Sequence, residues 1–498
     1  MSPTLRFGTA GIRGALGEGP QHMNAELIEL AATAIAEWLP PASSVIIGRD
    51  ARHGSEAFAN VIGRVLKKSG HHPRSFSEPV PTPLVAYAVG SSDAAAGVMI
   101  TASHNPATDN GLKVYTADGG QLLPDDAAII EEAMAALPWP GAVDTSAPAG
   151  VDLLGPDIIE GYLRVITVAA GEFPTAPSGI VVAYSAMHGV GGALFERALS
   201  EAGHQVRSVP EQHQPNPDFP TAPFPNPEEP GTLELVRARA DAVGADIVLA
   251  NDPDADRLAV SIRMGSGWQR LTGDQIGVLL GWYVLQQTSL PCTVSTSVVS
   301  STLLGKLTVA RGARHRETLT GFKWLARAGD SDAPLAFAYE EALGYAVVPV
   351  IKDKDGISAG LAFANLVAWL QAHDRSVNDV LAEIGDEFGH HLNTQVSVRF
   401  VGSDATEKMS QLMRQLRAAP PDSIGAMGVV SIDDLAVGQH ALGGADVVIF
   451  NLENGRLIIR PSGTEPKVKG YLEVIDENSL AADGYLKNLA SATEALLG

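Results

Sequence analysis

Residues 245–260 read ADIVLANDPDADRLAV, and this stretch joins an apolar run to a loop of three carboxylates. The run 245–251 predicts a short buried strand. Asp252, Asp254 and Asp256 follow it at every second position. Carboxylates at this spacing can converge on one ion only from a tight loop, because on a strand they would share a face but lie too far apart. Oxygen ligands without His or Cys suit a hard cation such as Mg²⁺.

This acidic loop (residues 252–257) differs from a calcium-binding EF-hand, which also begins with the pattern D-x-D-x-D. An EF-hand needs Gly at loop position six and Glu at position twelve, where this chain has Arg257 and Arg263. An ordinary acidic surface loop remains the alternative for the stretch taken alone. A metal held by only three carboxylates keeps open coordination positions, which suits phosphate chemistry better than a structural role.

Composition indicates a large globular protein with an acidic surface. The chain has 498 residues, of which 45% are apolar and 18% charged, and this length predicts three or four domains. The net charge of −22 disfavours nucleic acid and anionic membranes as partners, so an anionic substrate needs a local basic site. A single cysteine, Cys292, permits no internal disulfide and fits a reducing cytoplasm. Neither a signal peptide nor an apolar run long enough to span a bilayer is expected.

Helix and strand signals alternate along most of the chain and indicate four domains. We expect three βα units, at residues 1–150, 151–269 and 270–388, because strands that alternate with helices imply mainly parallel sheets covered by helices. Residues 389–498 change to strands with helices between them, which indicates an α+β unit. Ser55 is expected to cap a helix in the first unit.

Nucleotide-binding fingerprints are absent from the sequence. The stretch 187–192 is rich in glycine, but a dinucleotide fingerprint would need Gly at position 194, where Leu194 stands. No Walker A pattern occurs. The chemistry of the protein therefore has to come from other loops.

A serine loop (TASHNP, residues 101–106) follows an apolar strand. A Ser in such a turn is well placed to present its hydroxyl, which needs a base or a metal to act as a nucleophile. His104 is expected to face a different way from Ser103, so a hydrolase triad is not implied, and the pattern G-x-S-x-G is absent. A simple capping turn explains this loop equally well when it is taken alone.

Two further loops carry charge next to glycine. The glutamate loop (YEEALGY, residues 339–345) places carboxylates at a strand end, where they can accept hydrogen bonds from two neighbouring sugar hydroxyls; an acidic helix start is the alternative. The basic loop (RPSGTEPK, residues 460–467) has Arg and Lys on either side of a Ser-Gly-Thr turn. Its hydroxyl and N–H groups can enclose a phosphate, which we favour because the protein is otherwise acidic.

These four loops resemble, in content and order, the active-site loops of the α-D-phosphohexomutase superfamily, the phosphoglucomutase/phosphomannomutase enzymes. The resemblance extends to FGTAGIRG at residues 7–14 and TGFKW at residues 320–324. It implies three related βα domains with mixed sheets and a smaller C-terminal α+β domain, arranged around a central cleft. It also implies a mutase that moves phosphate between C1 and C6 of glucose or mannose, with the phosphorylated sugar as partner and glucose 1,6-bisphosphate as activator.

The resemblance also assigns roles to residues. Ser103 carries a phosphoryl group, and one Mg²⁺ per chain is held by that group and the three aspartates of the acidic loop. The candidates for proton transfer are Arg13, His104, Lys113 and Arg257. The implied substrate-binding residues are Thr320, Gly321, Lys323, Glu340, Lys354, Arg460, Ser462, Gly463, Thr464 and Lys467.

Substrate choice stays open because the glutamate loop departs from the family pattern. Ala342 stands where many members have Ser, and Tyr345 where the bacterial enzymes often have His. These features resemble the branch that includes phosphopentomutases, so a ribose or deoxyribose phosphate is the alternative substrate. A noncatalytic sugar-phosphate-binding relative is a more distant alternative. Such proteins typically lose the serine or the aspartates, whereas this chain has Ser103 and all three aspartates. A monomer or a homodimer is expected.

Overall fold

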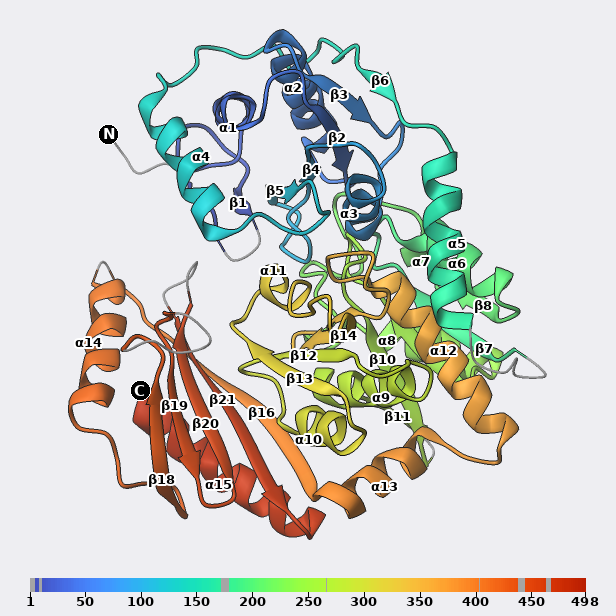
Figure 1. Cartoon of the computed structure of the whole chain (residues 1–498), viewed down its shortest axis with the longest axis vertical. Coiled ribbons are helices and arrows are strands. Elements are labelled where there is room, and N and C mark those ends of the chain that lie inside the picture. The colour runs from blue at the N-terminus through green and yellow to red at the C-terminus, as the bar shows by residue number, and fades with distance from the viewer. Residues whose placement is uncertain are drawn as a thin grey trace.

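The computed structural model describes residues 5–8, 11–171, 179–265, 267–402, 404–437, 444–462 and 467–498. Its strands form four separate sheets, each with its own helices, which we number as domains I to IV in chain order. Figure 1 shows domain I at the top, domains II and III beside each other below it, and domain IV at the lower left. Among the described helices, none is long and apolar enough to cross a membrane.

Domain I contains a six-stranded sheet covered by helices. Its elements are β1 (Ile12–Ala15), α1 (Ala25–Trp38), β2 (Ser44–Arg49), α2 (Ser55–Lys68), β3 (His72–Ser75), α3 (Thr82–Gly90), β4 (Ala96–Ile100), β5 (Asp109–Thr116), α4 (Pro124–Ala136) and β6 (Asp152–Leu153). The strand order is β1-β5-β4-β2-β3-β6. Strands β4, β2, β3 and β6 are parallel, whereas β5 and β1 are antiparallel to their neighbours. Because β6 pairs with β3, the first sheet extends just beyond residue 150.

Domain II repeats this plan with five strands. Its elements are α5 (Asp157–Gly171), β7 (Val181–Ser185), α6 (Gly192–Glu201), β8 (Gln205–Ser208), α7 (Pro210–His213), α8 (Glu234–Val243), β9 (Ile247–Ala250), β10 (Ala259–Met264) and β11 (Gly267–Arg270). The order is β11-β10-β9-β7-β8. Strands β9, β7 and β8 are parallel, and β10 and β11 are antiparallel.

Domain III has the same plan with four strands. Its elements are α9 (Gly273–Leu285), β12 (Thr293–Ser297), α10 (Leu303–Ala310), β13 (Arg314–Thr318), α11 (Phe322–Leu325), β14 (Leu335–Glu340), β15 (Gly344–Ala346), α12 (Gly356–Ala372) and α13 (Val377–Phe388). The order is β13-β12-β14-β15, with only β15 antiparallel. A capping box between Thr272 and Gln275 starts α9, and the Asp355 carboxylate caps α12.

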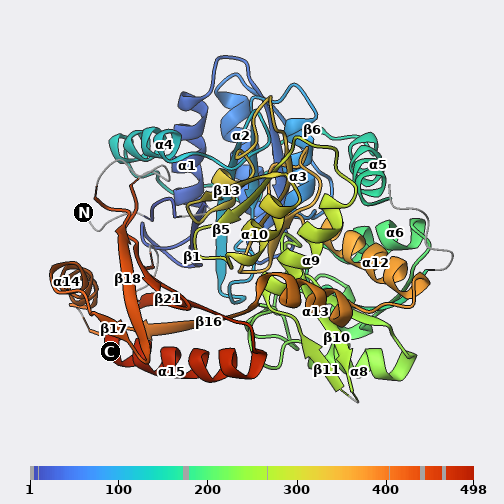
Figure 2. The ribbon, with the colours of Figure 1, turned by 60° about the horizontal axis from the view of Figure 1, so that its bottom comes forward.

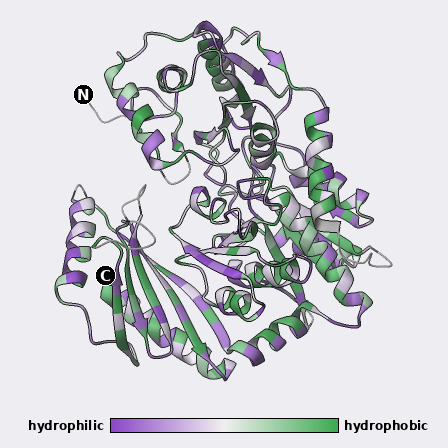
Figure 3. Cartoon of the chain, viewed as in Figure 1, coloured by the Kyte–Doolittle hydropathy of each residue, from purple (hydrophilic) through white to green (hydrophobic). Residues whose placement is uncertain are grey.

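Domain IV is built on a different plan, a six-stranded antiparallel sheet. Its elements are β16 (His390–Arg399), α14 (Ala405–Ala418), β17 (Ser423–Ile424), β18 (Met427–Asp434), β19 (Val448–Leu452), β20 (Gly455–Pro461), β21 (Lys467–Asp476) and α15 (Ser479–Leu497). The order is β16-β21-β20-β19-β18-β17, and every pairing is antiparallel. Hydrophobic and hydrophilic residues alternate along these strands (Figure 3), as expected for a sheet covered on one face.

The cores follow this division only in part. One continuous cluster of buried side chains runs through domains II and III and includes the α3 face of domain I. Helices α5, α6 and α12 pack together within it and lie side by side at the edge of the molecule (Figure 2). The opposite face of the domain I sheet has its own core with α1, α2 and α4. Domain IV also has its own core. Domains I to III therefore form one body, to which domain IV is attached.

Most local predictions from sequence agree with the fold, and one needs correction. The expected α+β character of the last unit and the helix-covered sheets of the first three are confirmed. Ser55 does not cap a helix: it is the first residue of α2, its hydroxyl donates to Asp50, and Gly54 precedes it with φ of 81°. Ser55 was mistaken for a cap because a Ser at a helix start can equally hydrogen-bond to a preceding carboxylate.

Candidate active site

Three of the four loops occupy the same place in their domains. The serine loop joins β4 to β5, the acidic loop joins β9 to β10, and the glutamate loop joins β14 to β15. In each domain this is the connection from the last parallel strand to the antiparallel strand beside it. The basic loop also joins two antiparallel strands, β20 and β21. Each of the four loops is therefore a connection between antiparallel neighbours in its own sheet.

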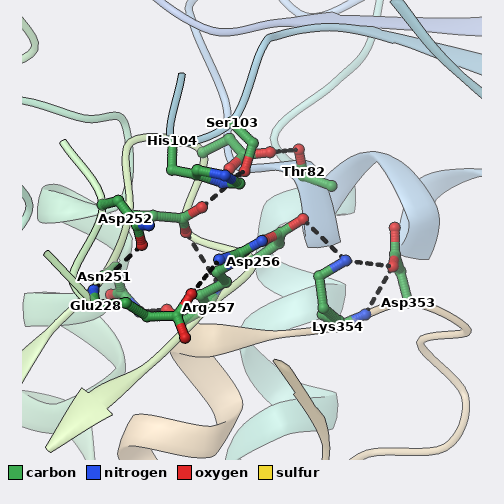
Figure 4. Close-up of polar contacts among 12 residues, drawn as sticks. Thr82, Ser103, His104, Glu228, Asn251, Asp252, Asp256, Arg257, Asp353 and Lys354 are labelled. Atoms are coloured by element: carbon green, nitrogen blue, oxygen red, sulfur yellow. Dashed lines mark hydrogen bonds and ion pairs between the residues drawn. The ribbon is translucent and has the colours of Figure 1, made fainter. Parts of the chain in front are cut away.

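Ser103 lies at the contact between domains I and II. Its Oγ donates a hydrogen bond to Asp252 Oδ2 at 2.8 Å and lies 3.2 Å from His104 Nδ1 (Figure 4). The residue has a φ of 55°, which a Ser adopts rarely and which marks a site where the fold imposes strain. Its N–H donates to Thr101 Oγ1, and the Arg52 guanidinium donates to its carbonyl. The serine is thus held rigidly on both sides.

The prediction that His104 faces away from Ser103 is wrong. The left-handed backbone at Ser103 folds the turn back, so that the next ring lies beside the serine hydroxyl. Burial, together with the charges of Arg257 and Arg13, lowers the pKa of His104 well below its usual value. The imidazole is therefore neutral at pH 7. The sequence could not reveal this, because the positive φ is set by contacts from other elements.

The three aspartates of the acidic loop converge, as their spacing predicts. One ligand oxygen from each of Asp252, Asp254 and Asp256 lies within 4.8 Å of the others, and all three residues are buried. Oδ1 of Asp254 and Oδ1 of Asp256 are buried with no hydrogen-bond partner among the described residues. Buried carboxylate oxygens without partners are costly, and a hard cation would satisfy them. The group can therefore hold a metal ion.

Lys113 neutralises much of this negative charge. Its Nζ lies 2.7 Å from Asp254 Oδ2 and 2.8 Å from Asp256 Oδ2, and the side chain is buried. Burial disfavours the ammonium ion, but the charges of Asp254 and Asp256 are strong enough to keep the pKa of Lys113 above its usual value. Thr82 donates a further hydrogen bond to Asp254 Oδ2 at 2.7 Å. Domain I thus provides the cation and the hydroxyl that balance the acidic loop of domain II.

Lys354 adds a second cation from domain III. Its Nζ lies 3.2 Å from Asp256 Oδ2 and 3.6 Å from Asp353 Oδ1 (Figure 4). Asp353 in turn accepts from Tyr115 and Gln121 of domain I. Burial favours a neutral Lys354, but Asp256 and Asp353 raise its pKa above the usual value. The ammonium group is therefore a fixed positive charge at the edge of the cleft.

The acidic loop is also held by backbone contacts from both neighbours. The N–H of Thr82 in domain I donates to the carbonyl of Asp254 at 2.9 Å. From domain III, the N–H of Gly356 donates to the carbonyl of Ala255 at 3.1 Å. Leu258 donates back to the carbonyl of Leu343 in the glutamate loop at 3.0 Å. The loop is thus positioned by three domains at once.

Domain III presents the glutamate loop to the same cleft. Glu340 Oε1 accepts a hydrogen bond from the Gly321 N–H at 2.6 Å, so the TGFKW stretch orients this carboxylate. Ala342 also lines the cleft. Tyr345 does not: it is fully buried, stacks on Tyr339, and its hydroxyl points to the carbonyl of Gly273. Tyr345 is therefore a core residue.

These loops surround a cleft of about 1180 Å³ that is lined by all four domains. The predicted site residues on its wall are Arg13, Ser103, His104, Asp256, Arg257, Thr320, Gly321, Glu340, Lys354, Arg460, Ser462 and Lys467. Asp252, Asp254 and Lys113 lie buried behind the wall. The lining found in the described part of the chain does not include Lys323. The predicted residues Gly463 and Thr464 lie outside the described residues.

Several polar residues of the wall were missed by sequence reasoning. Domain IV contributes Asn393, Gln395, Ser397 and Arg399, which alternate along β16, and Lys469 on β21. Polar residues at every second position of a strand face the same side of the sheet, and this pattern could have predicted them from the sequence. Arg6, Arg270 and Glu228 also line the cleft, as does Glu341 of the glutamate loop. For Arg6, Arg270 and Glu228 the sequence offers no comparable pattern.

Glu228 shows why the missed residues matter. It belongs to the proline-rich segment that precedes α8, and its carboxylate lies 3.2 Å from Arg257 Nη1 (Figure 4). Although burial disfavours the charged form, Glu228 and then the carboxylates of the acidic loop raise the pKa of Arg257 above its usual value. The guanidinium is therefore oriented beside the acidic loop by a segment that the sequence alone indicates only as an extended loop.

The cleft combines a serine, a buried carboxylate cluster and several cationic side chains, and comparison with known proteins identifies the family. Four models of the phosphoglucomutase/phosphomannomutase family match in order: its alpha/beta/alpha domain I at residues 4–139, domain II at 160–265, domain III at 272–388 and its C-terminal domain at 413–482. The chain belongs to this family, within the α-D-phosphohexomutase superfamily, and is a phosphohexomutase-type enzyme of the isomerase class.

Individual relatives cover nearly the whole chain. A "probable phosphomannomutase" of Haemophilus influenzae is 38% identical, over 95% of this chain and 98% of the relative. A phosphopentomutase of Mus musculus is 34% identical, over 94% of this chain and 84% of the relative. A solved phosphoglucomutase/phosphomannomutase family protein of Burkholderia thailandensis superposes with a TM-score of 0.76 at 19% identity, covering 98% of this chain and 97% of that one. The relatives thus share the fold and differ in their named sugars.

Proposed function

We propose that the protein interconverts the 1-phosphate and the 6-phosphate of glucose or mannose, with Ser103 as phosphoryl carrier and a bisphosphorylated sugar as intermediate. The observation that carries this proposal is the contact of Ser103 Oγ with Asp252 at the end of a cleft whose other wall bears Arg460, Ser462 and Lys467. A phosphate held on that wall would direct the far end of the sugar toward the serine. This arrangement favours phosphoryl transfer between Ser103 and the end of the sugar that faces it.

We further propose Mg²⁺ as the ion of the acidic loop. The donor set supports this choice, because it consists of three carboxylates with unsatisfied oxygens. When bound, Mg²⁺ supplies positive charge that stabilises the negative charge on a transferring phosphoryl group. Asp252, Asp254 and Asp256 would hold it beside Ser103, while Lys113 and Thr82 keep two of the three carboxylates in place.

Each transfer needs a proton acceptor for the attacking sugar hydroxyl. The O–P bond to Ser103 breaks as the sugar oxygen bonds to phosphorus, so the sugar hydroxyl must lose a proton and the serine oxygen left behind must gain one. Of the four candidates, His104 is the one whose side chain is neutral at pH 7, and its Nδ1 adjoins Ser103 Oγ. Arg13, Arg257 and Lys113 are cations beside the carboxylates. We therefore assign proton transfer to His104 and phosphate contact to the two arginines.

The bisphosphorylated intermediate must reverse its orientation within the cleft before it transfers its other phosphate to Ser103. A fixed phosphate wall and a fixed hydroxyl reader permit this, since the nonreacting phosphate is held at the same place in both orientations. Glu340 is suited to read the hydroxyls because Gly321 fixes one of its oxygens and leaves the other available. Lys354 lies beside the acidic loop, where its positive charge can stabilise the second phosphate of the bisphosphorylated sugar. Added glucose 1,6-bisphosphate would load Ser103 and start the cycle.

The experiment that tests the proposal compares kcat/KM for glucose 1-phosphate, mannose 1-phosphate and ribose 1-phosphate, with Mg²⁺ and a trace of glucose 1,6-bisphosphate. We expect a hexose phosphate to be preferred by about tenfold or more, which corresponds to about 1.4 kcal/mol of transition-state discrimination. A preference for ribose 1-phosphate would overturn the choice of hexose, and no turnover on any of the three would overturn the mutase assignment.

A phosphopentomutase is the second candidate, and two observations favour it. Ala342 provides no hydroxyl at the cleft wall, which removes one hydrogen bond to a hexose. The relatives include phosphopentomutases at a level of identity close to that of the phosphomannomutase relative. The same carrier serine and acidic loop would serve both reactions, so the side-by-side comparison above separates the two candidates.

A further inference from the structure

The turn between β12 and α10, residues 298–302 with the sequence VVSST, contacts both halves of the cleft wall. On one side it contacts the strands of domain IV that bear the basic loop. On the other it contacts the glutamate loop of domain III. The turn itself is not one of the four loops of the site. Through these two contacts it connects the glutamate loop to the strands of domain IV.

Toward domain IV the turn begins with two apolar side chains. Val298 and Val299 form one buried cluster with five residues of domain IV. These five are Leu435, Val447, Ile449, Ile458 and Tyr471. Ile458 lies on β20 and Tyr471 on β21, the two strands that the basic loop connects. The two valines thus pack against the domain IV sheet, which carries the proposed phosphate-binding residues.

The next part of the turn is bound by a buried carboxylate of domain IV. Glu473 on β21 accepts hydrogen bonds from Ser301 Oγ at 2.7 Å and from the Thr302 N–H at 2.8 Å. Its side chain also contacts His391 Nδ1 at 2.8 Å and Arg456 Nε at 3.2 Å. Burial disfavours the carboxylate, but His391 and Arg456 lower the pKa of Glu473 to about 2. The contact therefore remains charged through the whole physiological pH range.

Arg456 on β20 extends the same contact. It donates to the carbonyl of Ser300 and, at 3.2 Å, to Glu317 on β13. Its planar guanidinium can bind Glu473, Ser300 and Glu317 at once, because its donors point in fixed and different directions. Two strands of domain IV are thereby attached to one turn of domain III.

Toward the glutamate loop the turn uses the same residues. Ser300 Oγ accepts from the Glu341 N–H at 3.2 Å and lies 2.8 Å from Ser297 Oγ, which donates to Glu341 Oε2 at 3.2 Å. The Ser301 N–H donates to Asp274 Oδ1 at 2.7 Å, and that oxygen also accepts from Tyr339. Both ends of the Tyr339–Glu341 segment are therefore tied to the turn.

We infer that the β12–α10 turn fixes the distance between the hydroxyl-reading loop and the phosphate-binding strands, and that Ser300, Ser301, Arg456 and Glu473 are positioning residues for the mutase reaction. This inference rests on the proposed function. A bisphosphorylated intermediate that turns over inside the cleft is retained only while both walls keep their spacing. Loosening the turn should let this intermediate escape, while the chemical step at Ser103 continues.

The test uses Ser301→Ala, which removes one hydroxyl from Glu473 and leaves every cleft residue in place. We expect the KM for added bisphosphate, and the bisphosphate released per turnover, to rise about tenfold, the effect of losing one hydrogen bond to a charged group. The kcat at saturating bisphosphate should stay within about twofold of wild type. Ser301→Thr, which keeps the hydroxyl, should restore both values.

Ser295→Ala is the matched control. Ser295 lies on β12 just before the turn, is fully buried, and its hydroxyl has no hydrogen-bond partner among the described residues. It should change neither the KM for bisphosphate nor the release. The inference is overturned if Ser301→Ala leaves both values unchanged, or if kcat falls as much as the KM rises.

Hydrogen–deuterium exchange gives a readout that does not depend on activity. In Ser301→Ala, and in Glu473→Gln if it folds, the peptide that contains residues 339–345 should exchange faster than in wild type. Unchanged exchange there would overturn the coupling even if the enzyme is an active mutase. Conversely, a wild-type protein without mutase turnover would refute the proposed function, while the exchange measurement would still decide whether the turn couples the two walls.

Discussion

Ser103 Oγ lies 2.8 Å from Asp252 Oδ2, although the two residues are 149 positions apart in the chain. The serine comes from a hairpin of domain I and the aspartate from the equivalent hairpin of domain II. Neither domain alone contains both the hydroxyl and the carboxylate of this contact. The contact is built by docking two similar units so that their loops face each other, and it places a hydroxyl directly against a group that can hold a metal.

Ser103→Ala should abolish mutase turnover. The alanine has no oxygen to carry a phosphoryl group, so we expect kcat to fall by at least about a thousandfold. Steady-state rates at saturating bisphosphate measure this, and mass spectrometry of the intact protein should show a phosphoryl group on wild type only. Ser92→Ala, at the end of α3, is the control and should keep normal rates. Near-normal turnover in Ser103→Ala would exclude this serine as the carrier.

Lys113→Gln should destabilise the metal-free protein. Asp254 and Asp256 would lose their buried counter-ion, and breaking a buried pair by removing one partner costs about 3–5 kcal/mol. Mg²⁺ should restore part of this loss, because it neutralises the same carboxylates. Urea unfolding with and without Mg²⁺ measures both effects. Lys68→Gln on the surface of α2 provides the control, and equal stability of the Lys113 variant and wild type would contradict the prediction.

Glu341→Gln should alter how stability depends on pH. Burial, followed by the charges of Glu340 and Asp274, raises the pKa of Glu341 from 4.5 to about 7. Between these two values the folded state binds more protons than the unfolded state, so this residue makes stability fall as pH rises. The neutral glutamine removes that dependence. The melting temperature of the variant, relative to wild type, should therefore increase from pH 5 to pH 8.

The control for this measurement is Glu56→Gln, an exposed glutamate in the first turn of α2. An equal pH trend in this variant would assign the effect to the loss of a surface charge rather than to the burial of Glu341. A Glu341 variant whose relative melting temperature is flat, or falls with pH, would show that the carboxyl titrates at its ordinary value.

Ala342→Ser should shift substrate preference toward hexose phosphates. The added hydroxyl would stand on the cleft wall beside Glu340, where one extra hydrogen bond changes discrimination by about tenfold. The measurement is the ratio of kcat/KM for glucose 1-phosphate to that for ribose 1-phosphate. Ala342→Cys has nearly the same shape but only a weak hydrogen-bonding group, so it should keep the wild-type ratio. An equal shift in both variants would assign the effect to side-chain size.

The acidic loop was predictable from sequence in nearly all respects. Its spacing of two, its position after an apolar run and its lack of His and Cys were enough to predict convergence on one ion, and the structure brings the three oxygens together. The helix-covered sheets could also be predicted, because they follow from local periodicity. What local periodicity cannot give is contact between domains, such as the placement of Lys113 against Asp254.

The orientation of individual side chains was less predictable. His104 turns toward Ser103 because of a positive φ that the surrounding structure imposes. Tyr345, which stands where bacterial members often have His, packs in the core, since the antiparallel strand β15 begins at Gly344 and turns its side chain inward. Both outcomes depend on backbone geometry that is decided by packing between elements distant in sequence.

The single core shared by domains I to III has a consequence for how this protein can be divided. A chain cut near residue 150 or 269 would expose apolar surface on both fragments, since helix α5 packs against α3 and α12 across those limits. A cut near Gly389 would leave the two main cores intact and would open only the small apolar cluster that Val298 and Val299 form with domain IV. For fragment complementation or for exchanging modules between relatives, the molecule therefore has one natural boundary, and it lies between domain IV and domains I to III.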